Sequence, residues 1–247
     1  MRERHTQILD IIGRKKRVTV LELAEILQVS DVTIRKDLAV LEERGFLKRE
    51  HGFATLPESD DVSTRMLFNY EIKRRIAKKA LATITDGETI MIESGSCCAL
   101  LAEEIILNRR GVTIITNSIF IANFLRDRVG ARIILLGGEF QPESQVMVGP
   151  LIKKCAENFF VEKFFMGTDG FTERGAMSGD LMRAEAVNLM AESSRRKIIL
   201  TESKKFTSAG VVPLLPYKEI DSIYTDEKIS DDKKKFLEQR GVQIVIA

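Results

Sequence analysis

The sequence predicts an α/β protein in two parts, a small helical part at the amino terminus and a larger part with a sheet. Two short, well-capped helical patterns joined by a tight turn lie before Gly45, and a basic hairpin pattern follows them. From Asp86 onward, short apolar runs alternate with helical periods, as in a largely parallel sheet buried on both faces. We expect a winged helix-turn-helix domain over residues 1–56, a linker over 57–70 and an α/β domain over 71–247.

The amino-terminal domain should begin with a helix over about Arg4–Gly13. The next helix carries a capping box, in which the Thr19 hydroxyl accepts from the N–H of Glu22 and the Glu22 carboxylate accepts from the N–H of Thr19. Val18 and Leu23 stand at the two positions of a hydrophobic staple, which fixes how the chain enters this helix. The pattern therefore predicts a short helix with a well-defined start.

A third helix follows at once, with Ser30 as its N-cap. Its apolar residues recur at helical spacing and form one buried stripe, made of Ile34, Leu38 and Leu41. Arg35 and Lys36 fall away from that stripe, and Gly45 stands where a helix-ending glycine is expected. A short helix with a basic outer face suits the major groove of DNA.

Residues 46–54 predict a hairpin with Gly52 at its turn, the wing of a winged helix. Lys48, Arg49 and His51 lie in this hairpin, where their side chains could contact phosphates. The net charge of the chain is only +2, so DNA binding would depend on such local basic clusters. The residues that we expect at the DNA are Ser30, Asp31, Thr33, Arg35, Lys36, Lys48, Arg49 and His51.

The composition argues against several other classes of protein. Hydrophobic residues make up 44% and charged residues 30% of the chain, as in ordinary globular proteins. Cys97, Cys98 and Cys155 form no CxxC pair, so neither a disulfide framework nor a zinc site is expected. No signal peptide opens the chain and no apolar run could span a bilayer, so we expect a cytoplasmic protein without membrane contact.

The second domain follows a polar linker and alternates predicted strands with predicted helices. Strands are expected at Thr89–Glu93, Val112–Thr116, Arg132–Leu136, Val161–Met166, Lys197–Thr201, Ile220–Tyr224 and Val242–Ile246. Helices are expected at Tyr70–Thr83, Cys97–Leu107, Ile119–Arg128, Leu151–Asn158, Asp180–Ser194 and Asp231–Gln239. The charged residues Lys73, Arg74, Arg75, Lys78 and Lys79 should form a solvated face, with a contact to the DNA backbone or to another subunit as the alternative. Segment 170–179 should be a loop, either a lid or a passive surface loop.

Small and polar residues gather after the predicted strands, where open α/β sheets bind ligands. Hydroxyl and backbone N–H donors suit an anion, and polar side chains suit sugar hydroxyls. We therefore expect a small phosphorylated polyol there, although each loop alone could be ordinary turn chemistry. No catalytic residue, metal ion or cofactor is expected. The expected effector residues are Glu93, Ser94, Gly95, Ser96, Thr116, Asn117, Ser118, Gly137, Gly138, Gly167, Asp169, Glu185 and Lys205.

These motifs together resemble the DeoR family of bacterial transcriptional regulators over essentially the whole chain. The resemblance implies a winged helix DNA-binding domain joined to a sensor domain that is similar to the sugar-phosphate isomerase and coenzyme-A transferase superfamily. It also implies that a homo-dimer or tetramer represses sugar-uptake or sugar-catabolic operons on double-stranded operator DNA, relieved by a phosphorylated sugar. The matching motifs are residues 29–38 and 48–52 in the first domain and 93–96, 116–118, 137–138, 148–150, 165–170, 185 and 203–206 in the second.

Four positions depart from the family pattern. Phe53 stands where the wing usually has glycine, and we expect it to stiffen the wing or to pack on the domain. Glu93 and Cys97 stand where Asp and Thr are usual, and Met177 replaces another common Thr. A thiol at position 97 removes a hydroxyl donor, since sulfur donates only weakly.

Two other hypotheses stay open from the sequence. Glu93, Asp169, Glu185 and Lys205 could supply acid–base groups to a sugar-phosphate isomerase that carries an appended winged domain. Alternatively, the helix-turn-helix could serve only protein–protein contacts, in which case no DNA affinity is expected. We prefer the regulator, because an enzyme would need a separate reason for its DNA-binding half.

Overall fold

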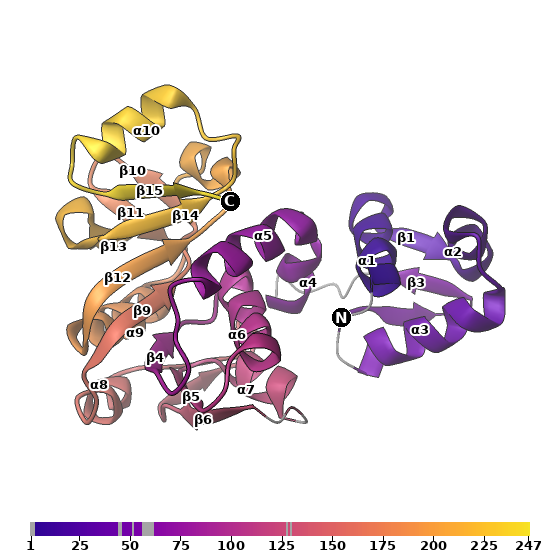
Figure 1. Cartoon of the computed structure of the whole chain (residues 1–247), viewed down its shortest axis with the longest axis horizontal. Helices are drawn as coiled ribbons and strands as arrows, with labels where there is room; N and C mark the ends of the chain where they lie inside the picture. Colours follow the sequence, from indigo (N-terminus) through magenta and orange to yellow (C-terminus); the bar gives the residue numbers. More distant parts are fainter. Residues whose placement is uncertain (1–2, 44–45, 51, 56–61, 127, 129) are drawn as a thin grey trace. The chain divides into compact units, whose positions relative to one another are not determined.

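The computed structural model describes residues 3–43, 46–50, 52–55, 62–126, 128 and 130–247 (Figure 1). The chain divides into two compact units, Met1–Glu71 and Ile72–Ala247, and each is described by itself. The expected helix-ending Gly45 and the wing residue His51 lie outside the described residues.

The first unit is a winged helix-turn-helix with its elements in the predicted order. Helices α2 and α3 pack against each other, and three short strands form an antiparallel sheet in the order β1-β3-β2. The elements are α1 (Glu3–Lys15), β1 (Arg17–Thr19), α2 (Val20–Leu27), α3 (Asp31–Glu43), β2 (Lys48–Glu50), β3 (Phe53–Thr55) and α4 (Val62–Leu67).

Both predicted helix starts are confirmed by their hydrogen bonds. The Thr19 hydroxyl accepts from the N–H of Glu22 at 3.1 Å, and the Glu22 carboxylate accepts from the N–H of Thr19 at 2.9 Å. The Ser30 hydroxyl accepts from the N–H of Thr33 at 3.2 Å and so caps α3. Gln28 adopts a left-handed backbone conformation with φ 53°, which ends α2 and turns the chain tightly into α3.

A buried carboxylate connects α3 to α1. The side chain of Asp37 accepts hydrogen bonds from the Arg4 guanidinium at 2.5 and 3.1 Å, and it contacts Nε2 of His5 at 3.0 Å. Only 3% of Asp37 is exposed. Burial alone would raise the pKa of Asp37, but these contacts outweigh burial and hold the pKa below its usual range.

Part of the expected linker is helical, which corrects the prediction from the sequence. Helix α4 covers Val62–Leu67, and Val62, Met66 and Tyr70 are buried at four-residue spacing. A helix of six residues offers too few turns for its period to stand out from a polar stretch.

The second unit is built on a seven-stranded sheet in the order β15-β14-β12-β9-β4-β5-β6 (Figure 1). All neighbouring strands run parallel, as predicted. The chain moves outward from β4 to β6 and returns on the other side of β4 with β9, so the strand order reverses between β4 and β9. The strands are β4 (Thr89–Ile92), β5 (Val112–Thr116), β6 (Ala131–Leu135), β9 (Val161–Met166), β12 (Ser194–Leu200), β14 (Ser222–Thr225) and β15 (Gln243–Ile246).

The predicted helices of this unit are present within a few residues of their expected bounds. Helix α6 is buried along almost its whole length, so it packs as a core helix with hardly any polar face. The helices are α5 (Tyr70–Leu81), α6 (Ser96–Asn108), α7 (Ile119–Leu125), α8 (Leu151–Ala156), α9 (Leu181–Glu192) and α10 (Asp231–Glu238), with short 3-10 turns at Ser203–Thr207 and Tyr217–Glu219.

One segment expected as a loop is a hairpin instead, and a second hairpin was not predicted. Segment 170–179 forms β10 (Gly170–Thr172) and β11 (Gly175–Ser178), and β11 pairs with β13 (Val212–Pro216). A second hairpin joins β7 (Glu139–Gln141) to β8 (Val146–Val148). Strands of three or four residues show too little alternation to be predicted. The segment expected as a lid or a passive surface loop is therefore a packed hairpin.

Replacing Asp37 with asparagine should destabilise the first unit, because the Arg4 guanidinium would lose its buried partner. Removing one member of a buried ion pair costs about 3 kcal/mol. We expect backbone amides of α1 and α3 to exchange with deuterium about 100-fold faster in the full-length variant. An unchanged exchange rate would contradict this role of Asp37.

Asp10→Asn is the matched control, because Asp10 pairs with Arg14 on the exposed side of α1 at 2.7 Å. We expect the rate of amide hydrogen exchange to change at most severalfold when this surface ion pair is lost. The pKa of Asp37 is depressed in the folded protein, so its contribution is present above the ordinary value of 3.8 and fades as the pH falls through the folded value. The difference between wild type and D37N should shrink accordingly in acid.

Candidate functional site

The outer face of α3 carries the residues predicted to contact DNA. Arg35 and Lys36 are both exposed. The Arg35 guanidinium lies 3.6 Å from the Asp31 carboxylate, and 65% of the Arg35 side chain is exposed. Such an exposed ion pair is weak, so Arg35 can exchange it for another partner at little cost. The hydroxyls of Ser30 and Thr33 lie 2.9 Å apart and are used to start the helix.

Arg49 connects the wing to α3. It is one of the two described wing residues that were predicted to contact phosphate, the other being Lys48. The N–H of Arg49 donates to the Glu42 carboxylate at 2.8 Å, and Nε of Arg49 donates to its other oxygen at 2.6 Å. Lys48, one residue earlier, is exposed. Arg49 therefore positions the wing, whereas Lys48 is the better candidate for a phosphate. A hollow of about 230 Å³ lies between helix and wing, lined by Val20, Arg35, Leu38, Glu42, Arg49, Gly52 and Phe53.

The phenylalanine that replaces the usual wing glycine packs on the first unit, as expected. The Arg17 guanidinium lies 3.8 Å from the centre of the Phe53 ring. Strands β1 and β3 pair at this point, with Thr19 opposite Phe53. A cation–π contact of this kind is worth about 0.5–1 kcal/mol at an exposed site. Phe53 thus adds a side-chain contact between β3 of the wing and β1.

At the carboxyl end of β4, the Glu93 carboxylate accepts hydrogen bonds from three groups of the protein. Its carboxylate accepts the N–H of Gly95 at 2.9 Å, the N–H of Gly167 at 3.1 Å and the Ser94 hydroxyl at 2.6 Å. Gly167 follows β9, so one carboxylate joins the loops on the two sides of the strand reversal. A Cβ on Gly95 would lie 3.2 Å from Cα of Gly167, so glycine is what lets these loops meet. Binding of an effector to these residues stays a prediction.

The three predicted residues at the end of β5 are all buried. Two of them serve local structure, because Ser118 caps α7 through the N–H of Ile121 at 3.1 Å, and the Thr116 hydroxyl accepts the N–H of Ser118. Asn117 donates from Nδ2 to the Met147 carbonyl at 3.0 Å. Its Oδ1 is buried and has no hydrogen-bond partner among the described residues. A buried acceptor left unpaired costs about 1–3 kcal/mol, so an added donor would be favourable there.

Asp169 and Lys205 come together with a residue absent from the predicted set, Arg183. The Asp169 carboxylate lies 3.8 Å from Nζ of Lys205 and 3.6 Å from the Arg183 guanidinium, and it accepts the N–H of Gly179 at 2.9 Å. Arg183 was missed because its significance depends on Asp169 and Lys205, which lie in other connections and come near it only in the fold. Its place in the first turn of α9 was the available signal, since helix amino termini favour anions.

The other predicted effector residues are more dispersed. Ser96 is the first residue of α6, and Gly137 and Gly138 follow β6. A Cβ on Gly138 would lie 2.4 Å from the Val148 carbonyl oxygen, so this glycine is needed for packing against β8. Glu185 is exposed, and its side chain makes no hydrogen bond or ion pair with any described residue.

The expectation of a solvated charge run is wrong for Lys73. Only 2% of Lys73 is exposed, and its Nζ lies 3.5 Å from the carboxylate of Glu202, which is also buried. Lys73 falls at helical spacing with Ile76 and Ala80 on the buried face of α5. Burial lowers the pKa of Lys73, while Glu202 opposes that shift. Burial raises the pKa of the nearby Cys97 thiol to about 12, so this thiol is a poor nucleophile.

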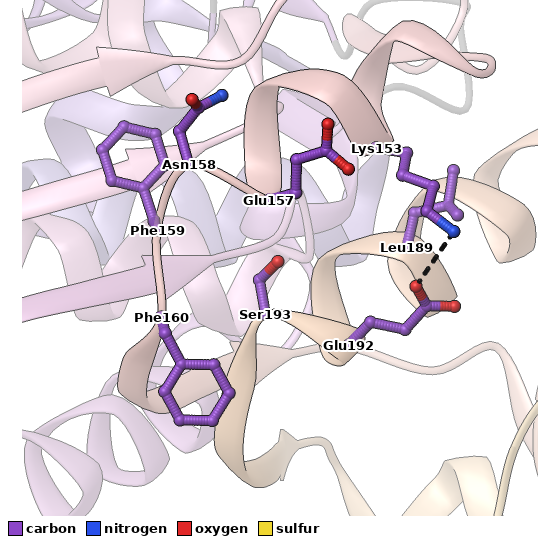
Figure 2. Close-up of a pocket in the computed structure, with 8 residues that line it drawn as sticks. All are labelled: Lys153, Glu157, Asn158, Phe159, Phe160, Leu189, Glu192 and Ser193. Atoms are coloured by element: carbon purple, nitrogen blue, oxygen red, sulfur yellow. Dashed lines mark ion pairs between the residues drawn. The ribbon is translucent and has the colours of Figure 1, made fainter.

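A separate hollow of about 480 Å³ opens between the ends of α8 and α9 (Figure 2). An ion pair of 3.6 Å joins Lys153 and Glu192, and 69% of Phe160 is exposed. Strands β9 and β12 begin here, so this hollow lies at the amino edge of the sheet, opposite the predicted effector residues. Its lining residues are Lys153, Glu157, Asn158, Phe159, Phe160, Leu189, Glu192 and Ser193.

Within the part of the chain that the structure describes, no helix is both long and apolar enough to cross a membrane. The same residues contain no group of three or more His, Cys, Asp or Glu side chains that could hold a metal ion. The three cysteines are free thiols, with Cys97 and Cys98 buried and Cys155 partly buried.

Both units match known domain families. Residues 4–60 match the DeoR-like helix-turn-helix domain, and residues 68–227 match the DeoR C terminal sensor domain. The chain belongs to the DeoR family of transcriptional regulators. The resemblance predicted from the sequence motifs is thereby confirmed. The order of a DNA-binding domain followed by a sensor domain is confirmed as well.

Two relatives show how far the similarity extends. The HTH-type transcriptional regulator GolR of Listeria innocua is 32% identical, over 99% of this chain and 98% of the relative. A lactose phosphotransferase system repressor of Staphylococcus epidermidis is 30% identical, over 94% of this chain and 95% of the relative. Both relatives are named as regulators. This chain, which belongs to the same family, is a transcriptional regulator rather than the isomerase considered above.

Among solved structures, ribose 5-phosphate isomerase from Plasmodium falciparum aligns with 57% of this DeoR-family chain and 55% of that chain. The sequence identity is 20% and the TM-score is 0.42. A likeness at this level says nothing about activity.

The exposed lysines of α3 and the wing should make DNA binding depend on salt concentration. Lys36→Ala and Lys48→Ala should each weaken binding to any DNA sequence and lower the slope of log K against log salt by about 1. Arg49→Ala should change the slope less, because the guanidinium is engaged by Glu42. Fluorescence anisotropy across a salt series would measure all three slopes.

Lys235→Ala is the control, because Lys235 is an exposed lysine of α10 in the second unit. Its slope should equal that of the wild type. A drop for Arg49→Ala as large as that for Lys48→Ala would show that Arg49 contacts phosphate directly despite its bond to Glu42.

Proposed function

We propose that this DeoR-family regulator binds double-stranded operator DNA through α3 and the wing, with domain boundaries at residues 56 and 70. In this proposal Arg35 contacts a base edge, while Lys36 and Lys48 contact phosphates and set the register. His51 keeps its predicted phosphate contact, although it lies outside the described residues. The exposure of Arg35 and Lys36 on the face away from the buried stripe of α3 supports this assignment.

The same proposal places a phosphorylated sugar at the carboxyl edge of the parallel sheet. The observation that carries it is Oδ1 of Asn117, a buried acceptor without a donor among the described residues. A sugar hydroxyl would supply that donor. Lys205, which meets Asp169 at the ends of β9 and β12, adds a charged partner on the same edge. The relative named for a lactose phosphotransferase system supports a sugar-related effector and repression.

Regulation requires that the effector binds one arrangement of the protein better than another, because equal binding shifts nothing. We propose a cytoplasmic homo-dimer or tetramer in which the effector changes the relative placement of two winged domains. Two-fold symmetry in the protein would then match two operator half-sites.

The DNA assignment is tested with Arg35→Ala on DNA taken from upstream of its own operon. Wild type should bind this DNA in the nanomolar range with strong salt dependence, whereas R35A should lose about 1–3 kcal/mol of specific binding. Binding to unrelated DNA should change little. Equal affinity and specificity in R35A and wild type would refute the role of Arg35.

The effector assignment is tested by adding sugar phosphates and their parent sugars to the same anisotropy assay. One phosphorylated sugar should shift the binding curve, and Asn117→Ala should raise the concentration required by about tenfold or more. Asn188→Ala is the control, because Oδ1 of Asn188 is likewise buried without a described partner but lies on α9. The same response in N117A and wild type would contradict the placement of the sugar at Asn117.

A further inference from the structure

We infer that Arg183, together with Lys205, recognises the anionic group of the effector, which is the phosphoryl group of a phosphorylated sugar. The inference rests on the proposed function and adds a specificity-determining residue to it. Lys205 lies in the 3-10 turn that follows β12, and Arg183 lies in the first turn of α9. Both side chains therefore reach the carboxyl edge of the sheet from different connections.

The two cations share a carboxylate and hold it loosely. The Arg183 guanidinium lies 3.6 Å from Oδ2 of Asp169, and Nζ of Lys205 lies 3.8 Å from Oδ1. Charge-assisted hydrogen bonds are shorter, at about 2.7–2.9 Å. Neither side chain donates a hydrogen bond to a described residue, although only 22% of Arg183 and 29% of Lys205 are exposed. Partly buried cations with unused donors favour an oxyanion that can approach more closely.

A phosphoryl group fits these donors better than the resident carboxylate does. A guanidinium presents parallel N–H groups that match two oxygens of a phosphoryl group, and Lys205 can donate to another oxygen. Asp169 is also held by the N–H of Gly179 at 2.9 Å, which ties its carboxylate to the loop before α9. Asp169 therefore stands as an internal anion where the phosphoryl group of the effector would bind.

Three other donors at this edge are already used. The Ser94 hydroxyl and the N–H groups of Gly95 and Gly167 all bind Glu93. Close to Arg183, Asp180 caps α9 by accepting the N–H of Arg183 at 2.8 Å, and its carboxylate lies 3.9 Å from Nε. Asp169 and Asp180 together balance the two cations. A phosphoryl group would therefore bind by displacing Asp169, since no surplus of positive charge is present to attract it.

Inorganic phosphate is the probe for this site, titrated against the full chain by thermal shift at constant ionic strength. Phosphate should stabilise the wild type, and Arg183→Ala should weaken its binding at least tenfold. Arg183→Lys should lie between them, because a point charge lacks the planar fork. Arg195→Ala is the matched control, since Arg195 pairs with Glu162 at 3.5 Å at the start of β12. No stabilisation of the wild type, unchanged binding by R183A, or an equal loss in R195A would each overturn the inference.

Asp169→Asn provides a test that misfolding cannot imitate. The substitution removes the competing charge but keeps an oxygen that can accept the N–H of Gly179. Phosphate should then bind at least threefold more tightly than to the wild type. Equal or weaker binding would show that Asp169 does not compete with the anion and would overturn the inference.

The DNA-binding assay separates failure of this inference from failure of the proposed function. A sugar phosphate that shifts the DNA-binding curve of R183A at the same concentration as that of wild type would overturn the role of Arg183. The proposed function would then still stand. If no sugar phosphate shifts the DNA-binding curve of the wild type, the proposed function fails. The titration with inorganic phosphate still decides whether Arg183 and Lys205 bind an oxyanion.

Discussion

Backbone N–H groups at the carboxyl edge of a parallel sheet need acceptors, and in this protein carboxylates of the chain provide them. Glu93 accepts from the loops after β4 and β9, and Asp169 accepts from the loop before α9. Asp226 accepts the N–H of Ser203 at 2.7 Å in the turn after β12. Burial alone would raise the pKa of Asp226, but the hydrogen bonds from Ser203 and Lys228 outweigh it and hold the pKa below its usual range. The loops of the proposed effector site are therefore organised by internal anions.

The first unit uses carboxylates in the same way, but with different burial. Asp37 is buried and joins α3 to α1, so it fixes the helix that presents Arg35. Glu42 is partly exposed and joins α3 to the wing through Arg49. A buried pair resists separation, whereas an exposed pair exchanges its partner at little cost. Helix α3 is thus held firmly and the wing more weakly, which in the proposed function would let the wing adjust to DNA.

Patterns that depend on local sequence were predictable, and those that depend on tertiary contacts were not. The capping box at Thr19, the cap at Ser30 and the parallel strands followed from spacing alone. Lys73 was misread because a charged residue on the buried stripe of a helix is stable only with a partner, and Glu202 lies far away in sequence. Arg183 escaped notice for a related reason. Its significance arises from Asp169 and Lys205, which the fold brings together from other connections.

When an effector replaces an internal carboxylate, its binding free energy is only the difference between the contacts that it makes and the contacts that it displaces. Asp169 holds the N–H of Gly179, so displacing it releases the loop that leads into Asp180, the N-cap of α9. Asp180 in turn accepts from Gln141 of β7 at 3.3 Å, which connects this loop to the hairpin beside Asn117. A parent sugar without phosphate carries no charge that could compete with a carboxylate for Arg183 and Lys205. In the proposed function, exchange of one anion for another thus gives a physical reason why the sensor would respond to the phosphorylated form of a sugar alone.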